Sequence, residues 1–239
     1  MEVINDVLEY KNLKIVQNPD MFQFSLDSVL LPNFVTINKN ITRILDVGTG
    51  NAIIPIILST KTSAKITAVE IQKEVSLLAR KSIDINHLEN QIELINDDIK
   101  NYYLECETEK FDIITCNPPY FKVSKDSNFN NSDYKTIARH EVKLNLNDIM
   151  KIAVKLLKNK GVIALVHRPE RLIDIIETMK KYNIEPKKIR FVYPGQNKEA
   201  NILLIEGKKN GNPGVKILNP LYSHEKNGKY TEEVRKYFS

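Results

Sequence analysis

Short runs of isoleucine, valine and leucine recur along this chain of 239 residues, and segments with helical periodicity separate them. The runs are apolar at consecutive positions, as in strands that helices cover on both faces. Strands and helices that alternate in this way favour an open, mostly parallel sheet with right-handed crossovers. The expected strands are Ile44–Val47, Lys65–Val69, Ile92–Ile95, Phe111–Cys116, Val162–His167, Ile189–Val192 and Asn201–Ile205.

Helical patterns lie between these strands. The expected helices are Pro55–Ser59, Gln72–Asn86, Asn147–Lys158 and Arg168–Lys181. The last two strands are joined by residues 193–200, a segment too short for a crossover helix. We therefore expect them to form an antiparallel hairpin at the edge of the sheet. The sequence predicts an α/β fold of Rossmann-like architecture, with a mostly parallel seven-stranded sheet and helices on both faces.

Two segments depart from this pattern. Residues 117–145 contain no expected strand and are rich in Asn, Ser, Asp and Lys, and a loop of that length is usually functional. Residues 207–239 begin with several glycines and prolines. We expect one domain over 1–206 with a short N-terminal extension. Residues 207–239 should form an irregular basic tail packed on or flanking that domain, with a short helix at Thr231–Phe238.

The net charge of +5 is unevenly distributed. Residues 1–100 carry a net charge of −3, whereas residues 101–206 and 207–239 each carry +4. A polyanionic partner is therefore expected to face one side, although a solvated surface without a partner gives the same count.

The two cysteines, Cys106 and Cys116, form no CxxC pair and belong to no Cys/His cluster, which favours a reduced cytoplasmic setting and predicts no metal. The N-terminus lacks the apolar region of a signal peptide. The longest apolar run, Ile53–Leu58, is too short to span a membrane. A monomer is the expected state.

A glycine turn follows the first expected strand. Its sequence is Asp46-Val47-Gly48-Thr49-Gly50-Asn51. Gly48 and Gly50 permit a tight turn and close approach of the backbone to a ligand, and Glu70, at the end of the second strand, can accept both hydroxyls of a ribose. Asp46 would repel a pyrophosphate but attract the ammonium of an amino acid. The pattern therefore favours S-adenosylmethionine over NAD, the alternative being a purely structural turn.

The third strand ends in a second acidic turn, Asn96-Asp97-Asp98-Ile99. Asp98 is a candidate acceptor for the N6 amine of an adenine. Ile71 and Ile99 are candidate apolar walls on either side of that base. An ordinary surface turn remains the alternative reading.

The most specific motif is Asn117-Pro118-Pro119-Tyr120, directly after the fourth strand. Two prolines fix two φ angles and hold the motif at the carboxyl edge of the sheet. The Asn117 side-chain oxygen and the Pro118 carbonyl can both accept from one planar amine. They would aim its lone pair out of the ring plane and stabilise the positive charge that develops during methyl transfer. Tyr120 offers a face on which a flipped base can stack.

With these motifs in this order, the chain resembles the class I S-adenosylmethionine-dependent amino-methyltransferases. Gln17 and the segment Phe22–Leu31 further resemble the opening of the bacterial tRNA1(Val) (adenine37-N6)-methyltransferase family, in which position 28 holds serine or alanine. The resemblance covers about residues 8–206. It implies the cofactor contacts Asp46, Gly48, Gly50, Glu70 and Asp98, the catalytic loop Asn117–Tyr120, and methylation of adenine 37. The residues themselves add Thr49, Asn51, Ile71, Ile99 and Asn117 to the predicted cofactor contacts.

Basic residues near aromatic ones suit contact with phosphates and stacking on an unpaired base. The candidate RNA-binding residues are Phe121, Lys122, Lys125, Arg139, Lys187, Lys188, Lys208 and Lys209. The expected partner is tRNA. Three alternatives stay open: a protein glutamine N5-methyltransferase, an amino-methyltransferase of rRNA or DNA, and a noncatalytic RNA-binding module on this fold.

Overall fold

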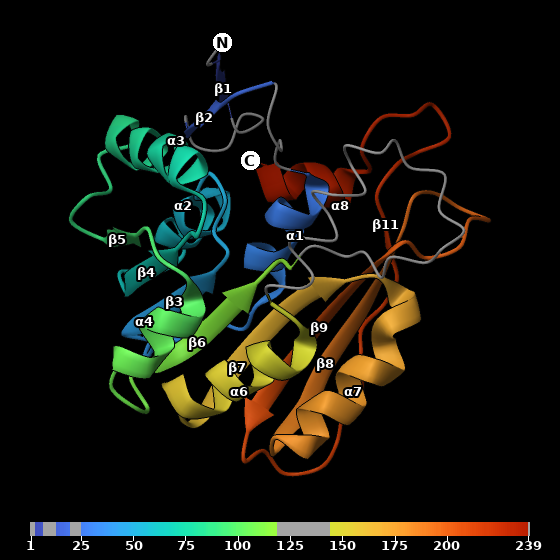
Figure 1. Ribbon diagram of the computed structural model, residues 1–239. Helices are drawn as coiled ribbons and strands as arrows, with labels where there is room; N and C mark the ends of the chain where they lie inside the picture. The colour runs from blue at the N-terminus through green and yellow to red at the C-terminus, as the bar shows by residue number, and fades with distance from the viewer. Residues whose placement is uncertain (1–2, 7–12, 20–24, 119–143, 239) are drawn as a thin grey trace, which may run out of the picture.

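The central element is a nine-stranded sheet. Eight of its strands follow the order β10-β8-β9-β7-β6-β3-β4-β5, and the ninth, β11, pairs with β8. The sheet is seen in a computed structural model (Figure 1) that describes residues 3–6, 13–19, 25–118 and 144–238. The strands of the sheet are β3 Arg43–Val47, β4 Lys65–Val69, β5 Ile92–Ile95, β6 Phe111–Cys116, β7 Leu157–His167, β8 Ile184–Tyr193, β9 Ile202–Lys209, β10 Lys216–Ile217 and β11 Leu221–Tyr222.

Strand β3 lies in the middle of the parallel part of the sheet. It pairs in parallel with β4 on one side and with β6 on the other. Strand β5 lies beyond β4, and β7 lies beyond β6. The strand order thus reverses at β3, and ligands of such sheets bind beyond the carboxyl ends of the strands at this point. β9 runs antiparallel to both β7 and β8. The expected mostly parallel sheet with an antiparallel hairpin is confirmed, but it has nine strands instead of the expected seven, because the short strands β10 and β11 add to β8.

Helices cover both faces. They are α1 Leu26–Phe34, α2 Ile53–Ser59, α3 Lys73–Ile85, α4 Ile99–Glu105, α6 Leu146–Leu156, α7 Leu172–Lys181 and α8 Glu232–Arg235, with 3-10 turns η1 Pro169–Arg171 and η2 Lys236–Phe238. One buried cluster joins the sheet to α1, α2, α3 and α8, and a second joins it to α4, α6 and α7. Figure 1 shows α6 and α7 together on one face and α1 beside α8 on the other.

The strands alternate between these two clusters. In β3, Ile44 belongs to the first cluster and Leu45 to the second, and Ile113 and Ile114 of β6 divide in the same way. Successive strand residues point to opposite faces, so a strand buried on both faces must be apolar at consecutive positions. Each fully buried isoleucine stabilises the fold by roughly 1.5–3 kcal/mol.

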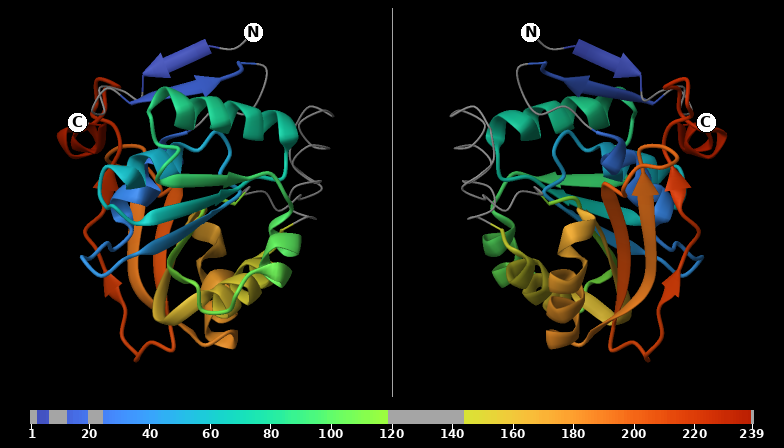
Figure 2. Two further views of the ribbon diagram at one scale, coloured as in Figure 1. Left: turned by 90° about the vertical axis from the view of Figure 1, so that its left-hand side faces the viewer. Right: turned by 90° about the vertical axis from the view of Figure 1, so that its right-hand side faces the viewer.

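A small hairpin lies outside the main sheet. Its strands, β1 Val3–Asp6 and β2 Lys14–Gln17, pair antiparallel over α3 (Figure 2). The amide of Val16 donates to the hydroxyl of Ser82 on α3 at 3.0 Å. The alternation of apolar and polar residues in these short runs is weak, and the sequence did not predict this hairpin.

The C-terminal segment is more regular than expected. Strand β9 continues to Lys209, and the short strands β10 and β11 both pair in parallel with β8. The guanidinium of Arg190 on β8 contacts Glu233 at 2.5 Å, which fixes α8 against the sheet. The expectation of an irregular tail is therefore wrong for these residues, because β8 offers a free edge for pairing. The expected helix near Thr231–Phe238 is present as α8 and η2.

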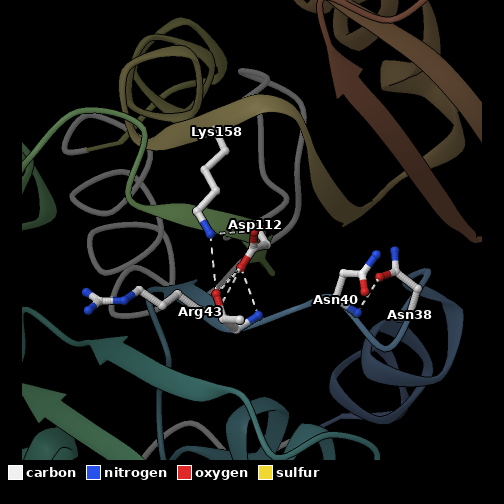
Figure 3. A network of polar contacts seen from close by, with 6 residues as sticks. Asn38, Asn40, Arg43, Asp112 and Lys158 are labelled. Atoms are coloured by element: carbon white, nitrogen blue, oxygen red, sulfur yellow. Dashed lines mark hydrogen bonds and ion pairs between the residues drawn. The ribbon is translucent and has the colours of Figure 1, made fainter.

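One partly buried carboxylate ties together three strands at the amino edge of the sheet. Asp112 accepts hydrogen bonds from both the amide and the hydroxyl of Thr42 and from the amide of Arg43, each at 2.9 Å (Figure 3). Lys158 of β7 donates to its other oxygen at 2.7 Å. Partial burial raises the pKa of Asp112, but these hydrogen bonds outweigh it, and the pKa is lowered overall.

Within the described ranges, no helix is long and apolar enough to cross a membrane. The same residues contain no cluster of His, Cys, Asp or Glu that could hold a metal ion. The predictions of a cytoplasmic location and of a monomer stay predictions.

Candidate active site

The glycine turn after β3 opens the candidate site. Gly48 and Gly50 both adopt left-handed backbone conformations, with φ of 67° and 61°. A Cβ atom built on either residue would meet no other atom within 4 Å, so space lies directly above the turn. The amides of Gly48 and Thr49 donate to the carbonyl of Val69 at 3.0 Å, which fixes the turn against the end of β4.

Asp46, the acidic residue before this turn, is 1% exposed. The parallel register places it beside Thr115 of β6, whose hydroxyl donates to Asp46 Oδ1 at 2.5 Å. Its other oxygen, Oδ2, is buried and has no hydrogen-bond partner. Burial raises the pKa of Asp46 to about 7, aided by the charge of Glu70 and opposed by the hydrogen bond from Thr115. A buried carboxylate with an unmet acceptor is costly unless a donor arrives from a ligand.

Two further residues of the turn are buried. The side-chain amide nitrogen of Asn51 is buried and lacks a hydrogen-bond partner, so this donor is also unmet. Ala52, the next residue, is fully buried with φ of 68°. A left-handed conformation costs a residue with a Cβ about 1–2 kcal/mol. Because Ala52 is also fully buried, a small side chain suits this position.

Glu70 joins the end of β4 to the turn. One of its carboxylate oxygens accepts from the amide of Gly50 at 3.0 Å and the other from the amide of Gln72 at 2.9 Å. Asn96, at the end of β5, donates to the Glu70 carbonyl at 2.8 Å. These bonds hold the Glu70 carboxylate beside the glycine turn, as its predicted role in binding a ribose requires.

The second acidic turn also lies at the carboxyl edge, after β5. Asp98 is the N-cap of α4 and accepts from the amide of Lys100 at 2.9 Å. Ile99 is 6% exposed, whereas Ile71 is 37% exposed. An exposed isoleucine beside a capped acidic turn leaves an apolar surface for a planar base.

Asn117 and Pro118 extend the carboxyl end of β6 toward the same edge. The side-chain nitrogen of Asn117 donates to the hydroxyl of Ser28 at 3.1 Å. Pro118 is buried. Thus the described half of the Asn-Pro-Pro-Tyr motif lies on the strand next to β3, which carries Asp46 and the glycine turn.

The remaining motif and lid residues lie outside the described residues. They are Pro119, Tyr120, Phe121, Lys122, Lys125 and Arg139. Their predicted roles stay predictions.

The other candidate RNA-binding residues lie on β8 and β9, where the structure gives internal partners to Lys187, Lys188 and Lys209. The ammonium of Lys209 is bonded to Glu109 at 2.9 Å and to the carbonyl of Leu157 at 2.8 Å. Lys188 contacts Glu206 at 3.1 Å, and Lys187 donates to the carbonyl of Asn212 at 3.0 Å. Lys208 is half-buried. We therefore leave Lys188 and Lys209 out of the proposed RNA surface, because their charges serve contacts within the domain.

Together these residues fit an amino acid joined to a nucleoside. Asp46 offers an unmet acceptor, Asn51 an unmet donor, and the glycines open space between them. An ammonium and a carboxylate would satisfy these two groups, and the contacts of Glu70 with a ribose and of Asp98 with an adenine stay predictions. S-adenosylmethionine has all four parts.

Comparison with known proteins agrees with this reading. A family of RNA methyltransferases matches residues 22–173. The chain belongs to this family. Its fold is that of class I methyltransferases, and the predicted fold class and the predicted S-adenosylmethionine dependence are confirmed.

Curated relatives and a solved structure extend the match. A protein of Parabacteroides distasonis is 29% identical, over 84% of this chain and 83% of its own length. One of Histophilus somni is 33% identical over 66% and 65%. Both are named tRNA1(Val) (adenine(37)-N6)-methyltransferase. A structure described as a predicted O-methyltransferase from Agrobacterium tumefaciens superposes with a TM-score of 0.71 at 20% identity, over 89% of this chain and 95% of that one.

Sequence reasoning did not find two residues that support the site. Thr115 lies inside an apolar strand, and only the parallel register shows that it faces Asp46. Ser28 lies 89 positions before Asn117, and no local pattern signals their contact. In the sequence, Ser28 belongs only to the segment that resembles a family opening, and that resemblance implies no particular bond.

Proposed function

We propose that this protein methylates the N6 amine of an adenine in tRNA, and that its target is adenine 37 of tRNA1(Val). The proposal rests on the position of Asn117 at the carboxyl end of β6, next to the strand that carries Asp46 and the glycine turn. This arrangement brings an amine-binding amide to the cofactor edge of the sheet. The named relatives, with matches that cover most of both chains, support the choice of substrate.

Bound at this edge, S-adenosylmethionine supplies an electrophilic methyl group on a sulfonium. The protein must then hold the acceptor amine in line with that methyl group. The Asn117 side-chain oxygen and the Pro118 carbonyl accept the two N–H bonds of the amine, which frees its lone pair. As the amine gains positive charge, both oxygens stabilise it, and the released proton can pass to solvent.

The protein needs no nucleophile of its own in this scheme. Cys116 directly precedes Asn117, but it is buried, and burial raises the pKa of its thiol well above the ordinary value. A thiol that stays protonated is a poor nucleophile. We therefore assign Cys116 to packing between β6 and the second buried cluster.

The direct test uses unmodified tRNA transcripts and S-adenosylmethionine carrying a labelled methyl group. We expect N6-methyladenosine in the wild-type reaction and a loss of about 10²–10³-fold in kcat for Asn117→Ala, the usual effect of removing one charge-stabilising group. Asn40→Ala, an exposed asparagine before β3, is the matched control and should retain wild-type kcat. A transcript in which adenine 37 is replaced by guanine should give no product.

The proposal fails if the wild-type protein transfers no methyl group to tRNA, or if Asn117→Ala is as active as the wild type. Transfer to a release-factor glutamine in the same assay would instead support the protein-modifying alternative. Transfer to adenine 37 of other tRNAs would keep the reaction and broaden the target.

A further inference from the structure

The amide of Asn117 has two ends with opposite hydrogen-bonding character. Its oxygen accepts and its nitrogen donates. An acceptor must face the substrate amine, because an NH₂ group turned toward that amine would oppose it donor to donor. The proposed reaction therefore depends on which end of the amide points outward.

In this structure the nitrogen end has a fixed partner inside the protein. Asn117 Nδ2 donates to Ser28 Oγ at 3.1 Å. Ser28 is 5% exposed, so water is a poor competitor for its hydroxyl. With the nitrogen turned toward α1, the oxygen is turned away from it.

The helix that carries Ser28 is itself firmly held. Its first turn begins at Ser25, whose carbonyl accepts from the amide of Ser28 at 3.1 Å. Just beyond its other end, the amide and the hydroxyl of Thr36 donate to the carboxylate of Glu206 on β9, at 2.8 and 3.0 Å. Helix α1 therefore cannot slide along the sheet without breaking these bonds, and Ser28 keeps its position beside Asn117.

We propose that Ser28 is a positioning residue, which anchors the Asn117 amide with its nitrogen toward α1 and its oxygen toward the substrate amine. The proposal rests on the function proposed above for Asn117.

Kinetics of Ser28→Ala provide the first test. Without the serine hydroxyl the amide loses its anchor and can rotate, so we expect kcat to fall about tenfold while the KM for S-adenosylmethionine changes less than twofold. Ser82→Ala is the matched control, since Ser82 is also a buried helical serine whose hydroxyl accepts an amide, that of Val16. It should lower the melting temperature as much as Ser28→Ala does and leave kcat unchanged.

A second readout is independent of activity. In a ¹⁵N-labelled protein, the side-chain amide signals of Asn117, assigned by their absence in Asn117→Ala, should shift in Ser28→Ala and exchange faster with solvent. Ser82→Ala should leave them in place. Unchanged Asn117 signals in Ser28→Ala overturn the positioning role, whether or not the protein methylates tRNA.

The two readouts separate this inference from the proposed function. If Ser28→Ala moves the amide signals but the wild type methylates no adenine, the positioning stands and the proposed reaction is wrong. If the wild type is active and Ser28→Ala keeps the full kcat, the positioning role is wrong and the reaction stands.

Discussion

The hydroxyl of Thr115 donates a 2.5 Å hydrogen bond to one carboxylate oxygen of Asp46, and both side chains are closed off from solvent. This bond satisfies only half of the carboxylate, because Asp46 Oδ2 has no partner. The parallel register of β3 and β6 thus builds a carboxylate that is held in place but incompletely solvated. Such a group costs stability in the empty protein and becomes useful when a cation binds.

The first prediction follows from this cost. The pKa of Asp46 is raised from 3.8 to about 7, so its contribution to stability is fully present below pH 3.8 and is lost as the pH rises through 7. Asp46→Asn imitates the neutral form. Without cofactor, we expect the stability advantage of this variant over the wild type to grow between pH 5 and pH 8, by on the order of 1–4 kcal/mol. Chemical denaturation at the two pH values measures the difference.

Asp112→Asn is the control with the opposite sign. The pKa of Asp112 is lowered, so its stabilising effect is present above the ordinary pKa and is lost as the pH falls through the lowered value. This variant should be less stable than the wild type at pH 8. Equal pH profiles for the two variants would show that the protonation of Asp46 has been wrongly assigned.

The second prediction concerns cofactor affinity. If the ammonium of S-adenosylmethionine binds the ionised form of Asp46, the affinity should be constant above pH 7.5. Below pH 7 it should fall by about tenfold per unit, since one proton must then leave on binding. Titration calorimetry in buffers of different ionisation enthalpy should detect that proton. In Asp46→Asn we expect weak binding without this pH dependence. A wild-type affinity that stays constant from pH 5.5 to 8 would show that the cofactor ammonium does not depend on the ionised form of Asp46.

The sheet was predictable because its signal is local. Consecutive apolar positions such as those of β3 and β6 are required wherever helices cover both faces, so the sequence places these strands to within a residue. Helix α4 was missed because it has seven residues and a largely polar surface, although Asp98 now proves to be its N-cap. Strands β10 and β11 have two residues each, and only the free edge of β8 makes them strands.

The candidate site also has features that the sequence predicts and features that depend on packing. Asp46, Glu70 and Asn117 follow strands whose carboxyl ends meet at one edge, so their sequence positions already bring them together. What the sequence does not reveal is which charges are already satisfied. Lys188 and Lys209 resemble surface lysines in the sequence. In the structure, however, Lys188 forms an ion pair with Glu206, and Lys209 forms one with Glu109. Pairs this far apart in the chain follow from packing.

A third prediction tests the space above the glycine turn. Gly50→Ala adds a methyl group where a Cβ meets no protein atom, and it strains a residue with φ of 61°. We expect a loss of about 1–2 kcal/mol in stability together with a large loss of cofactor affinity. Gly228→Ala is the matched control, because this residue also has a positive φ of 79° and no atom within 4 Å of a Cβ. It should cost similar stability and leave cofactor affinity intact. Equal losses of cofactor affinity in Gly50→Ala and Gly228→Ala would show that the cofactor does not bind at this turn.

A fourth prediction separates two neighbouring lysines. Lys209→Ala leaves the carbonyl of Leu157 without its donor, so we expect a loss of about 1–3 kcal/mol in stability. Lys208→Ala removes a half-buried side chain next to it and should cost less than about 0.5 kcal/mol. Neither Lys209→Ala nor a lysine-to-arginine change there should alter tRNA affinity once the protein is folded. A loss of tRNA affinity in folded Lys209→Ala would show that Lys209 contacts the RNA.

The last prediction concerns RNA binding, and its residues come from the sequence. Reversing the charges of Lys122, Lys125 and Arg139 to Glu should weaken tRNA binding and flatten its dependence on salt, because each lost phosphate contact lowers the slope of log K against log salt by about 1. The affinity for S-adenosylmethionine should change little, since the cofactor edge gathers acidic residues such as Asp46 and Glu70.

A control triple with the same change in net charge is available at the amino edge of the sheet. Lys39, Arg43 and Lys61 are exposed there, and reversing them to Glu keeps the cofactor edge unchanged. If binding depends only on net charge, both triples should weaken tRNA binding equally in filter-binding titrations between 50 and 200 mM salt. We expect the triple beside the Asn-Pro-Pro-Tyr motif to lose far more affinity, because the anticodon loop must reach Asn117 and its phosphates then lie at this edge.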